Sequence, residues 1–176
     1  AEKERITNAA IPIQEATDDM YICKLDTSGN LIWVKFAAPG PAIMGSRPSA
    51  MEFNSQGEIQ VMMGLGATGT LYPGFILDQG YYIIKFDTAG TMLDAINIVG
   101  ANTGGFIYNL TEIKIDTADN IYVAGYFSGD SMLISGQTLY KQSNTADMML
   151  YKINSTGTVQ WFHQIVVNDS IANIPN

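Results

Sequence analysis

The chain repeats itself with a period of about 64 residues. Three segments, at 20–33, 81–94 and 148–161, read MYICKLDTSGNLIW, YYIIKFDTAGTMLD and MMLYKINSTGTVQW. The first and the third align without a gap at an offset of 128. The coinciding positions are Lys24, Lys85 and Lys152, Gly29, Gly90 and Gly157, and the tryptophans Trp33 and Trp161. A fixed period of this length indicates a repeat architecture, in which one small structural unit recurs and is stabilised by its neighbours.

A second type of unit lies between these segments. Residues 51–61 read MEFNSQGEIQV, and residues 113–123 read IKIDTADNIYV. Units of both types have a strand of β-forming residues, a turn that begins with Asp or Asn, and a second strand. Asp or Asn at the start of such a turn accepts hydrogen bonds from backbone N–H groups two residues on, and a following glycine supplies the positive φ that closes a short hairpin. The repeat therefore contains two different β-hairpins.

Two hairpins give four strands for each repeat. In the second repeat we expect them at 82–87, 91–98, 111–116 and 120–127. Both faces of these strands carry apolar residues, which is typical of a sheet that is covered on both sides. Since no segment has a sustained helical period, other sheets must supply the cover. The sequence predicts an all-β protein made of β-propeller repeats, with about two to three four-stranded antiparallel blades stacked face to face.

The predicted propeller segment covers residues 1–176. It divides into a partial blade at 1–17, a repeat at 18–78, a repeat at 79–145 and a partial repeat at 146–176. Closed propellers have about four to eight blades, so we expect the chain to be a fragment of a larger propeller. Its expected partners are further propeller blades of the same protein or of another subunit.

The charge balance excludes some classes of partner. Nine lysines and arginines stand against 17 aspartates and glutamates, which gives a net charge of −8 at pH 7. An acidic chain without a basic stripe repels nucleic-acid phosphates and anionic membrane surfaces. Its apolar segments are much shorter than the roughly 18 residues that a membrane-spanning helix needs. We expect no nucleic-acid partner and no membrane span, and the sequence does not identify the protein or glycan ligand.

Residues with catalytic or metal-binding chemistry are few. His163 and Cys23 are the only histidine and the only cysteine, so the chain cannot build a zinc site from nitrogen and sulfur ligands. His163 has the chemistry of a general base, although a histidine on a strand surface is the favoured interpretation. Asp116, Asp119 and Asn120 are a candidate calcium site, because that cation takes oxygen ligands, but a hairpin turn explains the same residues. We predict no catalytic residue, no cofactor and no enzymatic activity.

The aromatic residues on the strands allow two interpretations. Aromatic faces stack on sugars, so these side chains are candidates for a carbohydrate-binding platform, but core packing is the stronger expectation at strand positions. The residues concerned are Tyr81, Tyr82, Tyr122, Tyr126, Trp33 and Trp161.

The three recurrent lysines share a strand face with the residue that opens the following turn, which is Asp26, Asp87 or Asn154. We expect each lysine stem to pack against a neighbouring blade while its ammonium reaches a carboxylate or a backbone carbonyl. The alternative is that all three are exposed and discourage edge-to-edge pairing of strands.

Two motifs alternate along the chain. A D-x-Y-I-x-K-x-D-x-x-G-x-x-x-W segment stands at 19–33, and a D-x-x-(G/D)-N-I-Y-V-x-G-x-F segment stands at 116–127. This alternation resembles the SBBP-type β-propeller repeats of bacterial, often Bacteroidetes-like, surface proteins. The chain departs from the pattern where Asp94 replaces the tryptophan and where Gly64 falls one place earlier than Gly125.

The resemblance implies an exported protein, and therefore an extracellular or cell-surface location. Because the recurring residues are structural, we expect a non-enzymatic binding or scaffold module within a larger secreted or cell-surface protein. The alternative is an accessory or catalytic propeller of a polysaccharide-degrading enzyme, with its active carboxylates on other blades.

Overall fold

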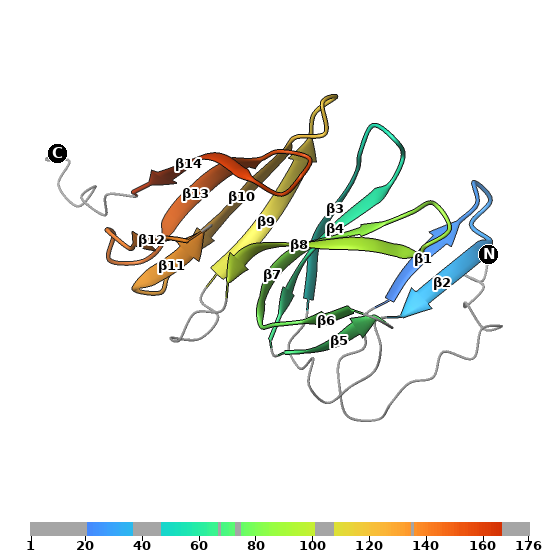
Figure 1. Cartoon of the computed structure of the whole chain (residues 1–176), viewed down its shortest axis with the longest axis horizontal. Coiled ribbons are helices and arrows are strands. Elements are labelled where there is room, and N and C mark those ends of the chain that lie inside the picture. Colours follow the sequence, from blue (N-terminus) through green and yellow to red (C-terminus); the bar gives the residue numbers. More distant parts are fainter. Residues whose placement is uncertain are drawn as a thin grey trace, which may run out of the picture.

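A computed structural model describes residues 21–36, 47–66, 68–72, 75–100, 108–134 and 136–166. Within these ranges every regular element is a β-strand, and all strand pairs are antiparallel (Figure 1). The prediction of an all-β protein is therefore confirmed.

The middle sheet has four strands in the order β3-β4-β7-β8. Their bounds are β3 Arg47–Phe53, β4 Ile59–Leu65, β7 Gly80–Phe86 and β8 Met92–Gly100. A short hairpin of β5 (Gly69–Tyr72) and β6 (Phe75–Leu77) is inserted between β4 and β7. Without this insertion the sheet is a simple meander.

The C-terminal sheet has the same plan, with its strands in the order β9-β10-β13-β14. Their bounds are β9 Tyr108–Ile115, β10 Ile121–Phe127, β13 Asp147–Ile153 and β14 Val159–Ile165. Its inserted hairpin consists of β11 (Ser131–Ile134) and β12 (Gln137–Tyr140). Ahead of both sheets lies the N-terminal hairpin of β1 (Tyr21–Leu25) and β2 (Leu31–Phe36).

The grouping of strands into sheets differs from the sequence prediction. The strands expected at 82–87, 91–98, 111–116 and 120–127 are present, but the first two are β7 and β8 of the middle sheet and the last two are β9 and β10 of the C-terminal sheet. The reason is that β4 pairs with β7 across the inserted hairpin, while β8 and β9 are not neighbours in a sheet. Each sheet therefore begins with the hairpin that the sequence prediction placed second in the repeat.

The middle sheet is covered on both faces. One face shares a core with the C-terminal sheet, in which Met62 and Ile83 meet Val123, Phe127 and Tyr151. The other face buries a second cluster, against which Ile22 and Trp33 of the N-terminal hairpin pack. Every residue of β4 is buried, as expected for a strand whose two sides both face neighbouring sheets. The three layers follow one another in chain order across Figure 1.

The hairpin turns have the predicted geometry. Oδ1 of Asp26 accepts hydrogen bonds from the backbone N–H groups of Ser28 (2.9 Å) and Asn30 (2.8 Å). Gly29 has a φ of 86°, in the left-handed region that glycine enters without steric cost. In the other hairpin type, Asp119 takes the corresponding conformation with a φ of 59°.

Candidate interaction surface

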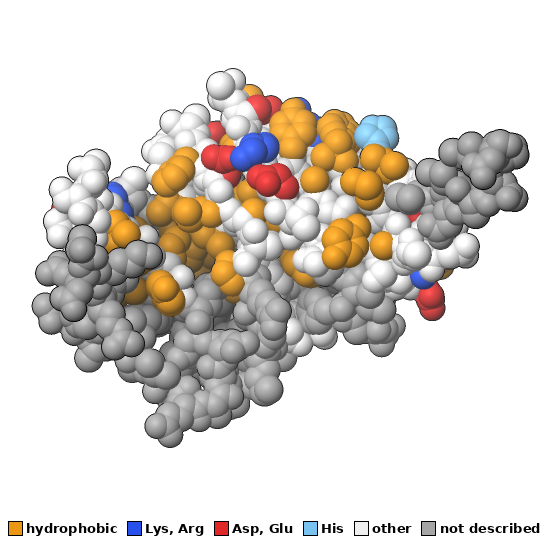
Figure 2. Space-filling view, turned by 180° about the vertical axis from the view of Figure 1, so that it is seen from behind, with side chains coloured by type: hydrophobic (Ala, Val, Ile, Leu, Met, Phe, Trp, Pro, Cys, Tyr) orange, Lys and Arg blue, Asp and Glu red, His pale blue; other side chains and the backbone are white. Residues whose placement is uncertain are grey.

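The outward face of the C-terminal sheet carries an aromatic and cationic cluster. Tyr122, Lys152 and Trp161 are direct neighbours across β10, β13 and β14. The Tyr122 and Trp161 ring centroids are 6.1 Å apart, and Lys152 Nζ lies 5.1 Å from the Tyr122 centroid. His163 is exposed, with its ring centroid 5.2 Å from that of Trp161. In Figure 2 hydrophobic side chains gather beside this single histidine.

The sequence placed Tyr122 and Trp161 in one candidate aromatic platform but did not connect Lys152 and His163 with them. The turn at 154–157 sets Lys152 opposite Trp161, a pairing that could be expected from the sequence. Tyr122 joins them through the β10–β13 pairing across the inserted hairpin, which the sequence does not state. The wider aromatic platform considered from the sequence is not one surface. Tyr81 and Tyr82 are buried, and Trp33 packs at the interface between the N-terminal hairpin and the middle sheet.

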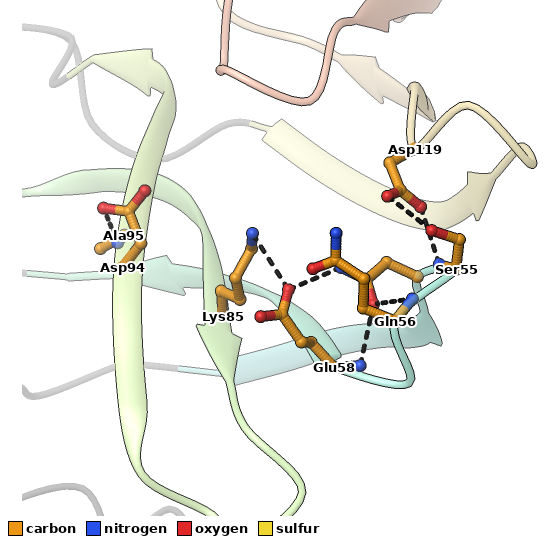
Figure 3. A network of polar contacts seen from close by, with 8 residues as sticks. Ser55, Gln56, Glu58, Lys85, Asp94, Ala95 and Asp119 are labelled. Atoms are coloured by element: carbon orange, nitrogen blue, oxygen red, sulfur yellow. Dashed lines mark hydrogen bonds and ion pairs between the residues drawn. The ribbon is translucent and has the colours of Figure 1, made fainter.

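Contacts between the two sheets join positions about one repeat apart. The carboxylate of Asp119 accepts hydrogen bonds from the backbone N–H (2.7 Å) and the hydroxyl (2.8 Å) of Ser55, which is 64 residues earlier (Figure 3). Lys114 Nζ lies 2.9 Å from Glu52 Oε2, at a separation of 62 residues. The hydrogen bond from Lys114 lowers the pKa of the Glu52 carboxyl. The first strands of the two sheets, β3 and β9, thus lie side by side.

The recurrent lysines reach oxygen atoms, as expected. Lys85 Nζ lies 3.1 Å from Glu58 (Figure 3), and Lys152 Nζ lies 4.0 Å from Asp116. The side chains of Lys85 and Lys152 are only 24% and 22% exposed, so neither is a solvated edge lysine. The sequence did not specify which carboxylate each ammonium reaches, and in both cases it lies in a turn of the lysine's own sheet. Lys24 is exposed, and its Nζ donates to the Thr88 carbonyl (3.4 Å) of the middle sheet.

Trp33 packs against the turn at 87–90 of the middle sheet. Its indole N–H donates to the Thr88 carbonyl at 3.2 Å. A Cβ atom on Gly90 would lie 3.0 Å from Trp33 Cζ3, so the absence of a side chain lets this turn rest on the indole ring. The turn at 154–157 rests in the same way on β8, where a Cβ on Gly157 would lie 2.8 Å from Ile96 Cγ2. These two turns therefore both sit on the last strand of the preceding layer.

The candidate calcium residues are arranged as a turn and an inter-sheet contact. The Asp116 carboxylate accepts hydrogen bonds from the backbone N–H groups of Ala118 and Asn120, from the Asn120 amide and from the Tyr122 hydroxyl. The hydrogen bonds from Asn120 hold the pKa of Asp116 below its ordinary value. Asp119 instead contacts Ser55. In the described residues, no three His, Cys, Asp or Glu side chains are grouped so that they could hold a metal ion.

Two apolar grooves separate β1 from the middle sheet. Their volumes are about 300 and about 350 Å³. Both are lined by Ile22, Cys23 and Met51, and the thiol of Cys23 is free and half-buried. In the described part of the chain β1 pairs with β2 alone, so its other edge faces these grooves.

No model of a known protein family matches the chain, and no curated protein sequence matches it significantly. The described residues contain no helical segment with the length and hydrophobicity that crossing a membrane requires.

Proposed function

We propose that the two four-stranded sheets are successive blades of a β-propeller, and that the chain serves as a non-enzymatic scaffold or binding module. The observation that carries the proposal is that equivalent elements of successive sheets touch. Ser55 in the β3–β4 turn contacts Asp119 in the β9–β10 turn, and Glu52 of β3 contacts the equivalent Lys114 of β9. Such contacts are expected when identical units stack in series.

The strand order supports the same assignment. Both sheets are four-stranded antiparallel meanders, and both place their first strands, β3 and β9, next to each other. In a propeller the first strand of each blade lies nearest the central axis, and the blades pack face to face around it. The N-terminal hairpin corresponds to the last two strands of a preceding blade, because β1 and β2 align with β7 and β8.

The use of the polar side chains supports a structural role. Asp26, Asp87 and Asp116 are engaged by the N–H groups of their own turns, and Glu58 is engaged by Lys85 and Asn54. Groups in these contacts stabilise the hairpins and have little freedom for acid–base chemistry. The resemblance to SBBP-type repeats adds the proposal that the module is extracellular or on a cell surface, within a larger protein.

Two experiments test the proposal. Cryo-electron microscopy of the natural full-length protein should show a closed ring of about four to eight blades, and an isolated two-sheet sandwich would contradict the propeller. An antibody against the chain should label intact cells of the source organism, and labelling only after lysis would contradict the location. The enzyme alternative predicts release of reducing sugar from polysaccharides by the full-length protein, whereas a scaffold releases none.

A further inference from the structure

One contact recurs between the N-terminal hairpin, the middle sheet and the C-terminal sheet, and each time the later layer contacts the earlier one. In each contact, a glycine-containing turn sits on the last strand of the layer before it. The turn at 87–90 sits on β2, and the turn at 154–157 sits on β8. The third turn of this type, at 26–29, is open, because no atom lies within 4 Å of the position a Cβ would take on Gly29. The third strand of this type is β14, on which Trp161 occupies the position of Trp33.

The outward face of the C-terminal sheet has the composition of a buried interface. Met148, Leu150 and Ile165 are 51%, 36% and 49% exposed. Their equivalents in the middle sheet, 67 residues earlier, are Tyr81, Ile83 and Ile98, which are 9%, 0% and 3% exposed. In the middle sheet these positions form the core against the C-terminal sheet. The same surface is therefore covered in one sheet and open in the next, and apolar patches of this kind mark interaction sites.

The opposite end of the molecule presents the complementary surface. Tyr21 and Leu25 of β1 are 54% and 46% exposed. Their equivalents 61 residues later, Tyr82 and Phe86, are 5% and 3% exposed and belong to the core between the middle sheet and the N-terminal hairpin. The middle sheet separates the two open faces (Figure 1), so one chain cannot pair them with each other.

We propose that the outward face of the C-terminal sheet docks onto the N-terminal hairpin of a second copy of this chain. The turn at 26–29 of the second copy sits on Trp161, as the turn at 87–90 sits on Trp33. The Trp161 indole N–H then donates to the carbonyl of Thr27 in the second copy, because Thr27 is equivalent to Thr88. His163 flanks the turn at the position that Lys35 holds beside Gly90.

A second copy is the favoured occupant because the chain has an open turn at 26–29 and an open last strand, β14. Equivalent turns and strands already contact each other twice within the chain. The contact is head-to-tail, so that each copy uses one surface to bind and presents the other to the next copy. The docking rests on the serial stacking of layers proposed above, because it extends to a second copy the contact that the turns make on β2 and β8.

The test is sedimentation velocity of the complete chain from micromolar to near-millimolar concentration. Wild type should associate, and Trp161→Ala should weaken association by about 30-fold, as expected for a central aromatic anchor. Gly29→Asn should weaken it similarly, because Asn tolerates positive φ but its side chain meets the indole. The matched control is Gly136→Asn, at a φ of 79° with nothing within 4 Å, which should associate like wild type.

Mixing the two variants gives the sharpest result. Trp161→Ala retains an intact 26–29 turn, and Gly29→Asn retains an intact Trp161 surface. Their mixture should therefore form dimers at concentrations where each variant alone is mostly monomeric. Circular dichroism confirms that each variant is folded. A wild type that stays monomeric throughout, association that neither substitution weakens, or a mixture that stays monomeric would each overturn the docking. A monomeric wild type would leave the propeller assignment to be decided by the full-length structure.

Discussion

The hydroxyl of Tyr151 offers a quantitative test of the core between the two sheets. Tyr151 is fully buried in the cluster that both sheets form, and its hydroxyl has no hydrogen-bond partner among the described residues. A buried polar group without a partner costs about 1 to 3 kcal/mol. Tyr151→Phe removes the hydroxyl and keeps the ring, so the variant should be more stable by about 1 kcal/mol. For a chain of this size the melting temperature should rise by about 2 to 4 °C.

The effect of Tyr151→Phe should also depend on pH. Burial raises the pKa of Tyr151 above its ordinary value of 10.0. Above pH 10 the unfolded chain releases this proton while the folded chain retains it, so the wild type loses about 1.4 kcal/mol of stability per pH unit from this group. The variant lacks this loss. Its advantage should therefore be constant below pH 10 and grow above it.

Urea unfolding at neutral pH and at about one unit above pH 10 measures both effects. Tyr140→Phe is the matched control at neutral pH, since that side chain is 68% exposed and its midpoint should not change. A variant at Tyr151 that is less stable than wild type would show that the hydroxyl has a partner. If the stability difference between Tyr151→Phe and wild type does not grow above pH 10, burial does not raise the pKa of Tyr151.

Three further substitutions test the contacts between strands and sheets. Lys85→Met should be more stable than Lys85→Ala by about 1 kcal/mol in urea unfolding, because Met keeps the packing of the stem, and equal midpoints would show that the stem packs on nothing. Gly157→Ala should destabilise by about 1 kcal/mol more than Gly29→Ala, since both residues have a φ of 86° but only Gly157 lies against Ile96; equal losses would contradict that contact. In a double-mutant cycle, Ser55→Ala and Asp119→Ala should show a coupling energy of about 1 kcal/mol, and additive losses would mean that the two side chains do not interact.

The local structure was predictable because it depends on local chemistry. The D-x-x-G turns were expected from the side-chain acceptor of Asp26 and the positive φ of Gly29, and both are present. The burial of β7 followed from the apolar residues on both of its faces. These features need only neighbouring residues, so a single sequence contains them.

The arrangement of strands between sheets was not predictable in the same way. A repeat in the sequence has no natural starting point, and the pairing of β4 with β7 across an inserted hairpin is a long-range choice. The carboxylate partners of Lys85 and Lys152 were not identifiable for this reason, since only the β4–β7 and β10–β13 pairings bring Glu58 and Asp116 beside them. The cluster around Trp161 likewise depends on the β10–β13 pairing, which the sequence does not state.

The central claim is that equivalent turns and strands of successive sheets lie against each other. Engineered disulfide trapping tests it directly, with Ser55→Cys and Asp119→Cys combined in a Cys23→Ser background. Because these two side chains are within hydrogen-bond distance, mild oxidation should give one disulfide within a single chain, detected by mass spectrometry as the loss of two hydrogens without a change in oligomeric mass. The control pair Ser28→Cys and Asp119→Cys, on turns of the first and third layers, should stay reduced. Two free thiols in the test pair after oxidation, in a folded protein, would contradict the stacking of the sheets.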